Sequence, residues 1–174
     1  MENETSAEYW IENLSLFKHP EGGYYREIYR SEELISREHL PERYSGTRAF
    51  ATSIYFLLKS DDFSAFHKIL SDEIWTIIDG CTTEIFCISE GGSLVKHLLG
   101  KNVKSGELPQ ILINKNTWFG AKLIEKNSFI LVNCFVSPGF SFDDFELAKR
   151  KNLISRYPLH KDIIIRLTPP DFVL

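Results

Sequence analysis

Between residues 48 and 136 the chain is a succession of short runs in which hydrophobic and polar positions alternate. The runs are rich in β-branched and aromatic residues, and turn sequences such as SDD, DG, EGG and EKN separate them. They are AFATSIYFLL, FSAFHKIL, DEIWTIID, TEIFCIS, SLVKHLL, QILINK, WFGAKLI and SFILVNCFV. Short strands at this spacing predict an antiparallel sandwich or barrel.

Helical spacing replaces this alternation near the start of the chain. Residues 8–17 (EYWIENLSLF) bring Trp10, Leu14 and Phe17 to one face of a helix. Ser6 precedes them and can cap the first turn. The pattern predicts a short amphipathic helix.

The remaining segments complete the expected domain. Residues 24–29 alternate and predict a strand, whereas residues 31–46 are charged and predict a long exposed loop. The C-terminal stretch returns to helical spacing and is broken near Pro158. Because no repeat and no flexible linker divides the chain, we expect residues 1–174 to form a single domain.

Composition and charge exclude several classes of protein. The 174 residues are 43% hydrophobic and 13% aromatic, which is far from a disordered composition. The net charge of −4 comes from 20 basic and 24 acidic side chains that are spread along the chain, so no nucleic-acid partner is expected. The sequence MENETSAEYW lacks the features of a secretory signal, and no apolar run is long enough to cross a membrane. We therefore expect a cytoplasmic protein without a membrane partner.

The three cysteines do not suggest a disulfide framework or a zinc ribbon. Cys81, Cys87 and Cys134 are odd in number and form no C-x-x-C pair. They are expected to be small thiols in strands.

Several collinear segments resemble the Cupin_5 group (DUF985) of the cupin superfamily. They are HPEGGYYREIYRS, SIYFLL, FSAFHKILSDEIWTIIDG, SLVKHLLG, NTWFGAKL and CFVSPGFSFDDFELA. The resemblance implies an all-β cupin jelly roll, a double-stranded β-helix, with short helices at the N- and C-terminal ends. It also implies a homodimer, but it supplies no reaction.

The metal-binding motifs of general cupins are incomplete in this sequence. Glu73, six residues and Gly80 fit the first motif, but His67 is the only histidine before them, and Lys68 stands where another ligand is expected. The sequence INKNTWF stands where the second motif has proline, glycine and histidine, so Phe119 replaces the last ligand. Tight binding of a transition metal is therefore not expected, and we assign no metal ligand and no cofactor.

His67 and Glu73 are the candidate catalytic residues. If both face the barrel interior, they form a general acid/base dyad of the kind that cupin-like sugar epimerases use without metal. The alternative is that the two side chains form a hydrogen-bonded structural pair in a polar-lined barrel. The sequence leaves both open.

Other residues are candidates for ligand binding. Arg26 offers a guanidinium to a carboxylate or phosphate, although a surface ion pair is an alternative. Trp75 and Trp118 offer flat rings, although core packing is the more common role. The remaining candidates are Tyr24, Tyr55 and Lys68, whose orientation depends on strand register. The other histidines, which include His19, have no paired spacing and are expected in loops or solvent.

These observations predict a small-molecule pocket inside the barrel. We expect it to take a polar, anionic metabolite and to support metal-independent isomerase or epimerase chemistry. One alternative is a ligand-binding or sensor module without catalysis. Another is a metal-dependent cupin enzyme.

Overall fold

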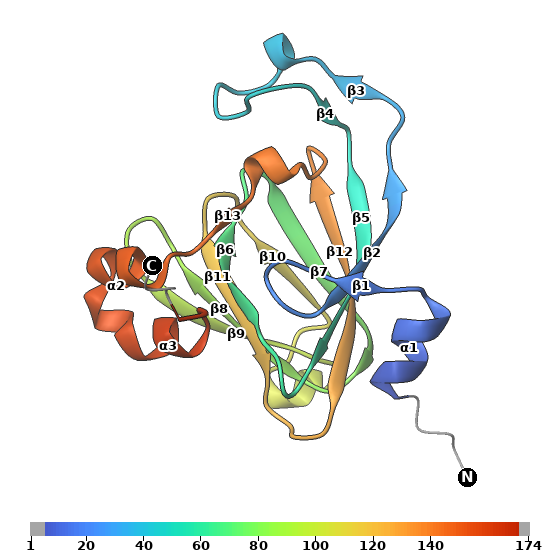
Figure 1. The fold of residues 1–174 in the computed structure, drawn as a ribbon, viewed down its shortest axis with the longest axis vertical. Coiled ribbons are helices and arrows are strands. Elements are labelled where there is room, and N and C mark those ends of the chain that lie inside the picture. Colours follow the sequence, from blue (N-terminus) through green and yellow to red (C-terminus); the bar gives the residue numbers. More distant parts are fainter. Residues whose placement is uncertain (1–5, 171–174) are drawn as a thin grey trace.

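A computed structural model describes residues 6–170 and shows two antiparallel sheets packed face to face (Figure 1). The six-stranded sheet has the order β1 (Phe17–Lys18), β2 (Tyr24–Arg30), β5 (Thr52–Lys59), β12 (Phe129–Ser137), β7 (Asp72–Gly80), β10 (Gln110–Ile113). The five-stranded sheet has the order β13 (Glu146–Leu147), β6 (Ser64–Lys68), β11 (Trp118–Leu123), β8 (Thr83–Ile88), β9 (Leu94–Leu99). This arrangement is the predicted jelly roll.

The main core fills the space between the two sheets. Along β7 the buried positions are Glu73, Trp75 and Ile77, so every second side chain points inward. Phe119 of β11 approaches this row from the opposite sheet, with its ring 6.1 Å from that of Trp75. The alternation visible in the sequence is therefore the alternation between barrel interior and exterior.

Strand register decides which polar residues share the interior. One row of paired residues crosses the six-stranded sheet on its inner face: Glu27, Ile54, Cys134, Trp75 and Ile111. The neighbouring row lies on the outer face: Arg26, Tyr55, Asn133, Thr76 and Gln110. In β2 the register shifts between Glu27 and Tyr29, which places Arg30 opposite Thr52 and in the next inner row.

Helix α1 (Ala7–Asn13) covers part of the outer face of the six-stranded sheet. The Ser6 side chain accepts a hydrogen bond from the Tyr9 backbone N–H at 3.1 Å, as predicted for a cap. The helix is shorter than predicted because the chain turns at Ser15, whose φ is 51°. Leu16 then packs with Leu57 and Leu131 instead of continuing the helix.

Two short helices cover the outer face of the five-stranded sheet. They are α2 (Arg150–Arg156) and α3 (Lys161–Arg166), and the 3-10 turn η4 (Pro158–His160) joins them at the predicted break. Ile163 and Ile164 pack on Phe66 and Trp118 of the sheet. No helix within the described residues is long and apolar enough to cross a membrane.

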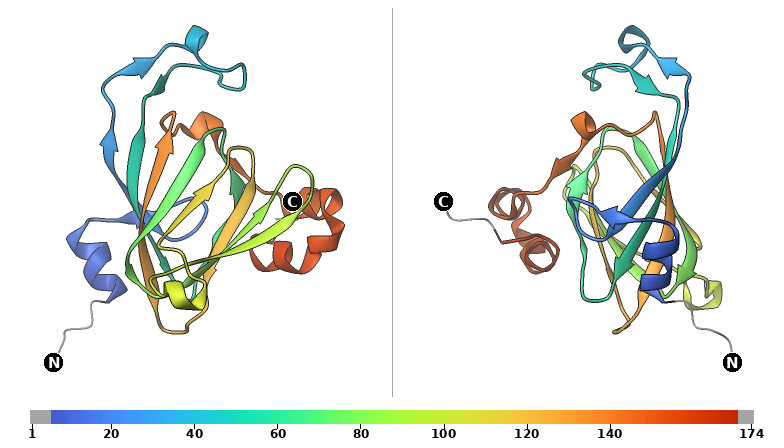
Figure 2. Two further views of the ribbon diagram at one scale, coloured as in Figure 1. Left: turned by 180° about the vertical axis from the view of Figure 1, so that it is seen from behind. Right: turned by 45° about the vertical axis from the view of Figure 1, so that its right-hand side comes forward.

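The segment predicted as a loop over residues 31–46 belongs to an arm that extends from one end of the barrel (Figure 2). It contains a small ladder, β3 (Leu34–Ile35) with β4 (Arg48–Ala49), and the 3-10 turn η1 (Arg37–His39). Two further 3-10 turns, η2 (Val103–Ser105) and η3 (Phe142–Asp144), lie in the loops after β9 and β12.

Candidate functional site

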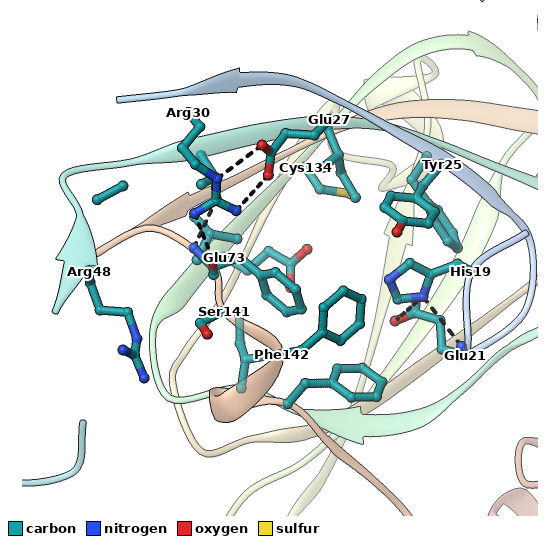
Figure 3. A pocket seen from close by; sticks show the side chains of 18 of the residues that line it. His19, Glu21, Tyr25, Glu27, Arg30, Arg48, Glu73, Cys134, Ser141 and Phe142 are labelled. Carbon is teal, nitrogen blue, oxygen red and sulfur yellow. Dashed lines mark hydrogen bonds and ion pairs between the residues drawn. The ribbon is translucent and has the colours of Figure 1, made fainter. Parts of the chain in front are cut away.

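A partly open cavity of about 700 Å³ lies inside the barrel (Figure 3). The inner faces of β2, β5, β7 and β12 form one side, and β6 contributes His67 from the facing sheet. The arm and the segment around η3 line the mouth. The site is therefore built from segments that are far apart in the sequence.

Glu73 is a buried carboxyl that lines this cavity. The Trp75 indole N–H donates to its Oε1 at 2.9 Å, and the Cys134 thiol, on the neighbouring strand, also bonds to the carboxyl. Burial raises the pKa of Glu73 to about 7, although both hydrogen bonds lower it. Near neutral pH this group is therefore available in both protonation states.

His67 forms a buried pair with Glu21. Its Nδ1 lies 2.7 Å from the Ala65 carbonyl oxygen, which can only accept, so Nδ1 carries a proton. Its Nε2 lies 3.1 Å from Glu21 Oε2, and the Ser64 hydroxyl donates to the other carboxyl oxygen at 2.7 Å. Burial lowers the pKa of His67 to about 3, and it raises the pKa of Glu21 well above its ordinary value. Both shifts favour a neutral imidazole whose Nε2 accepts a hydrogen bond from a neutral carboxyl.

His19 is the second imidazole at Glu21. Its Nδ1 accepts from the Glu21 backbone N–H at 3.3 Å and lies 3.3 Å from Oε2 of the same residue. Burial lowers the pKa of His19 to about 4. His19 lies in the loop between β1 and β2, as expected, but this turn brings its ring into the cavity rather than into solvent.

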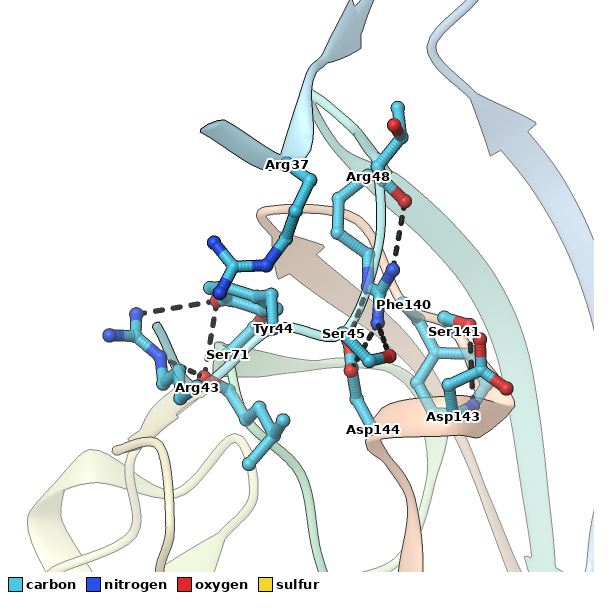
Figure 4. A network of polar contacts seen from close by, with 12 residues as sticks. Arg37, Arg43, Tyr44, Ser45, Arg48, Ser71, Phe140, Ser141, Asp143 and Asp144 are labelled. Carbon is cyan, nitrogen blue, oxygen red and sulfur yellow. Dashed lines mark hydrogen bonds and ion pairs between the residues drawn. The ribbon is translucent and has the colours of Figure 1, made fainter. Parts of the chain in front are cut away.

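The two guanidinium groups at the mouth are already paired. Arg30 Nε and Nη2 donate to the two Glu27 carboxylate oxygens at 3.0 and 2.6 Å. Arg48 makes the equivalent double contact with Asp144 at 2.7 and 2.5 Å, and this second pair is buried (Figure 4). In the view of Figure 3, Glu73 lies between the Arg30–Glu27 pair and the His19–Glu21 pair.

Comparison with known proteins assigns the family. The family model described as Cupin superfamily (DUF985) matches residues 8–148. The chain belongs to this cupin family. The match confirms the resemblance and, with the structural neighbours below, the cupin jelly roll.

Several relatives of this cupin have solved structures or curated sequences. Protein SO0799 from Shewanella oneidensis superposes with a TM-score of 0.87 at 39% identity, over 95% of this chain and 99% of that one. A hypothetical protein from Leishmania major gives 0.86 at 31% identity, over 94% and 98% of the two chains. The uncharacterized protein YML079W of Saccharomyces cerevisiae is 29% identical over 83% of this chain and 76% of the yeast protein. None of these names carries an activity.

Three predicted site residues of the cupin line the cavity. They are His67, Glu73 and Trp75. The structure does not bring His67 and Glu73 together as a directly bonded dyad. Instead His67 bonds to Glu21, and Glu73 bonds to Trp75.

The predicted placement of Arg26, Tyr24 and Tyr55 in the pocket was wrong. All three lie on the outer face of the six-stranded sheet, because the inward positions of β2 are Tyr25 and Glu27. The exposed Arg26 donates to the Leu14 carbonyl at 3.0 Å. Tyr24 and Tyr55 pack in the cluster under α1.

Lys68 and Trp118 were also predicted to reach the pocket, and both lie outside it. They occupy the outer face of the five-stranded sheet, one position away from the inward residues His67 and Phe119. The Lys68 ammonium lies over the Trp118 ring and 2.9 Å from a Glu146 oxygen. Trp118 packs against the C-terminal helices.

Some residues that line the cavity of this cupin were not predicted from the sequence. They include His19, Glu21, Arg30, Arg48 and Cys134. His19 and Glu21 sit in a turn, where no periodicity shows which way a side chain points. The bulge in β2 reverses the face that simple alternation assigns to Arg30.

The polar residues of the cavity do not match the donor set that general cupins offer to a metal. No group of three His, Cys, Asp or Glu side chains within residues 6–170 is arranged to hold a metal ion. The Nε2 lone pair of His67 faces the Glu21 carboxyl, and Phe119, which replaces the last histidine in the motif comparison, is the cross-strand neighbour of His67. These side chains therefore do not fit the metal site of a general cupin.

Proposed function

We propose that this cupin is a metal-independent isomerase or epimerase that moves a proton on a polar small molecule held in the barrel. The observation that carries the proposal is the Glu73 carboxyl, buried against the cavity with a pKa raised to about 7. A group that exists in both protonation states at working pH suits general acid/base catalysis.

The facing sheets suggest how a proton is removed and returned. The Glu73 carboxylate takes a proton from a C–H group beside a carbonyl, and the electron pair moves onto the carbonyl oxygen to give an enolate. The His67–Glu21 pair, on the other side of the cavity, then returns one proton to the same carbon as the carbonyl re-forms. Atoms and electrons balance without an oxidant or reductant, and exchange with water restores both groups.

The proposed ligand is polar, but Arg26, the cation that was expected to bind an anion, lies outside the cavity. Arg30 and Arg48 line the mouth, and an anion there would have to compete with Glu27 and Asp144. We therefore propose that hydrogen bonds and ring contacts, rather than a free cation, supply most of the recognition.

A ligand-binding module without turnover is the second candidate. The observation that favours it is that Glu21, His67, Ser64 and the Ala65 carbonyl satisfy one another's hydrogen bonds. Such a closed set can be structural, in which case it offers no proton to a ligand.

Deuterium exchange separates the two candidates. The protein is incubated in D₂O with a panel of hydroxy aldehydes, hydroxy ketones and keto acids, and loss of C–H signals is followed by proton NMR. We expect catalysed exchange for at least one compound, reduced about 100-fold or more in Glu73→Gln. Ligand affinity should stay within about tenfold, and Glu90→Gln, an exposed change outside the cavity, should have no effect. Compounds that bind in the cavity without exchange would favour the binding module, and exchange that survives Glu73→Gln would contradict the catalytic role.

A further inference from the structure

One wall of the cavity is a cluster of aromatic rings. Phe140, Phe142 and Phe145 come from the segment after β12, and His19 comes from the turn after β1. The Phe140 and Phe142 ring centroids are 5.1 Å apart, and the His19 and Phe142 rings are nearly parallel, with an interplanar angle of 25° at 6.2 Å. Although Phe142 lines the cavity, it is 53% exposed, so part of its surface is left without a protein partner.

This aromatic wall is anchored at several points. The Phe140 backbone N–H donates to Thr52 Oγ1 at 2.9 Å, and its carbonyl accepts from Arg30 at 3.1 Å. The buried Arg48–Asp144 pair holds the end of η3 against the arm. These contacts already order the rings, so little conformational entropy is lost when a ligand packs on them.

We propose that the cavity binds a small molecule with a planar unsaturated ring, which packs against Phe142 and His19. The placement of the ligand's polar group beside Glu73 depends on the function proposed above, but the preference for a ring does not. The substrate class is thus a ring compound with a carbonyl-bearing substituent.

Ring geometry favours this ligand over an aliphatic one of the same size. Burial of apolar area stabilises both, but only an unsaturated ring adds offset-stacked or edge-to-face contacts with the wall. His19 is neutral at physiological pH because burial lowers its pKa, so its ring packs as an uncharged heterocycle. The cavity volume is within the range of sites for small organic ligands.

Matched uncharged probes test the proposal without requiring turnover. Benzamide and cyclohexanecarboxamide differ in ring saturation and carry the same polar group. Affinities for the full chain are measured by NMR titration, with assigned amide signals to locate each probe. We expect benzamide to bind about fivefold more tightly and to perturb signals of residues 140–145.

The Phe142→Leu variant keeps an apolar side chain but removes one ring of the wall, so the affinity ratio between the two probes should fall by about twofold or more. Phe135→Leu is the matched control, because Phe135 is a partly exposed ring of β12 on the outer face of the six-stranded sheet, away from the cavity. Equal affinities in the wild type, no binding of either probe at millimolar concentration, or perturbations outside the cavity would overturn the proposal. Benzamide selectivity that persists in Glu73→Gln while deuterium exchange is lost would show that ring binding and catalysis are separate properties.

Discussion

The folded barrel favours the protonated form of Glu73, so the free energy of unfolding depends on pH. The ordinary pKa of the side chain is 4.5, and burial raises it to about 7. Below pH 4.5 the carboxyl is protonated in both the folded and the unfolded chain. As the pH rises from 4.5 to about 7, the unfolded chain releases the proton first, so the free energy of unfolding falls.

Glu73→Gln should therefore stabilise the protein more at high pH than at low pH. The amide keeps an oxygen that accepts from Trp75, and it has no charge to bury. Between pH 5 and pH 8 the free energy of unfolding of the variant should rise relative to the wild type by about 2–3 kcal/mol. Urea unfolding at both pH values measures this change, with Glu90→Gln as the control. A difference that does not depend on pH would contradict the raised pKa.

The side chains at His67 and Phe119 also determine how much transition metal the protein should contain. His67 directs Nε2 at Glu21, and Phe119 offers no ligand where general cupins have a histidine. Protein purified without chelator should contain well below one equivalent of Mn, Fe, Ni, Cu or Zn by elemental analysis. Stoichiometric metal that disappears in His67→Ala would contradict this prediction and return the metal-dependent enzyme to consideration.

At the scale of elements, the sequence predicted the strands but not the faces of all of them. Glu73 and Trp75, both named as candidates from the sequence, share the inner face of β7 because residues two apart on a strand point to the same side. It could not decide whether Arg26 or Glu27 points inward, because both faces of β2 carry polar and aromatic residues. The direction is set by the packing of α1 on one face and by pairing with β5.

The arm and η3 were harder to predict because long-range contacts fix them. Arg48 and Asp144 are 96 residues apart, and their sequence surroundings give no sign that they pair. Tyr44 bonds to Ser71 in a similar way, with its hydroxyl 2.9 Å from Ser71 Oγ (Figure 4). The residues that shape the mouth of the cavity therefore had to be located from the structure.

Arg48→Ala should be strongly destabilising, because it leaves Asp144 buried without its partner. We expect a loss of about 3–5 kcal/mol in the free energy of unfolding. Arg30→Ala is the comparison, since the Arg30–Glu27 pair and the Arg30 contact with the Phe140 carbonyl are both exposed, and their loss should cost only about 1 kcal/mol. Chemical denaturation of both variants checks the comparison. Similar losses in the two variants would show that the buried Arg48–Asp144 pair contributes no more to the free energy of unfolding than the exposed Arg30–Glu27 pair.

At the scale of the whole molecule, the outer face of the six-stranded sheet is notable for its apolar side chains. One row of paired residues crosses it: Tyr29, Ser53, Phe135, Ile74 and Leu112. Tyr29, Phe135 and Leu112 are 50%, 38% and 54% exposed. The outer face of the five-stranded sheet differs, because α2 and α3 pack against it.

We propose that the predicted homodimer forms through this exposed row. A two-fold interface uses the same patch on both subunits, and a row that crosses a sheet can pack on its own copy. The chain has a mass of 20.1 kDa, so light scattering at micromolar concentration should return about twice that value. Phe135→Lys should shift the particle toward the monomer without loss of β-sheet signal, because it places a charge where two apolar faces would meet. Leu159→Lys, at a 94% exposed position in η4, should leave the dimer intact. A monomeric wild type, or a dimer lost in Leu159→Lys but kept in Phe135→Lys, would place the apolar row outside any interface between copies of the chain.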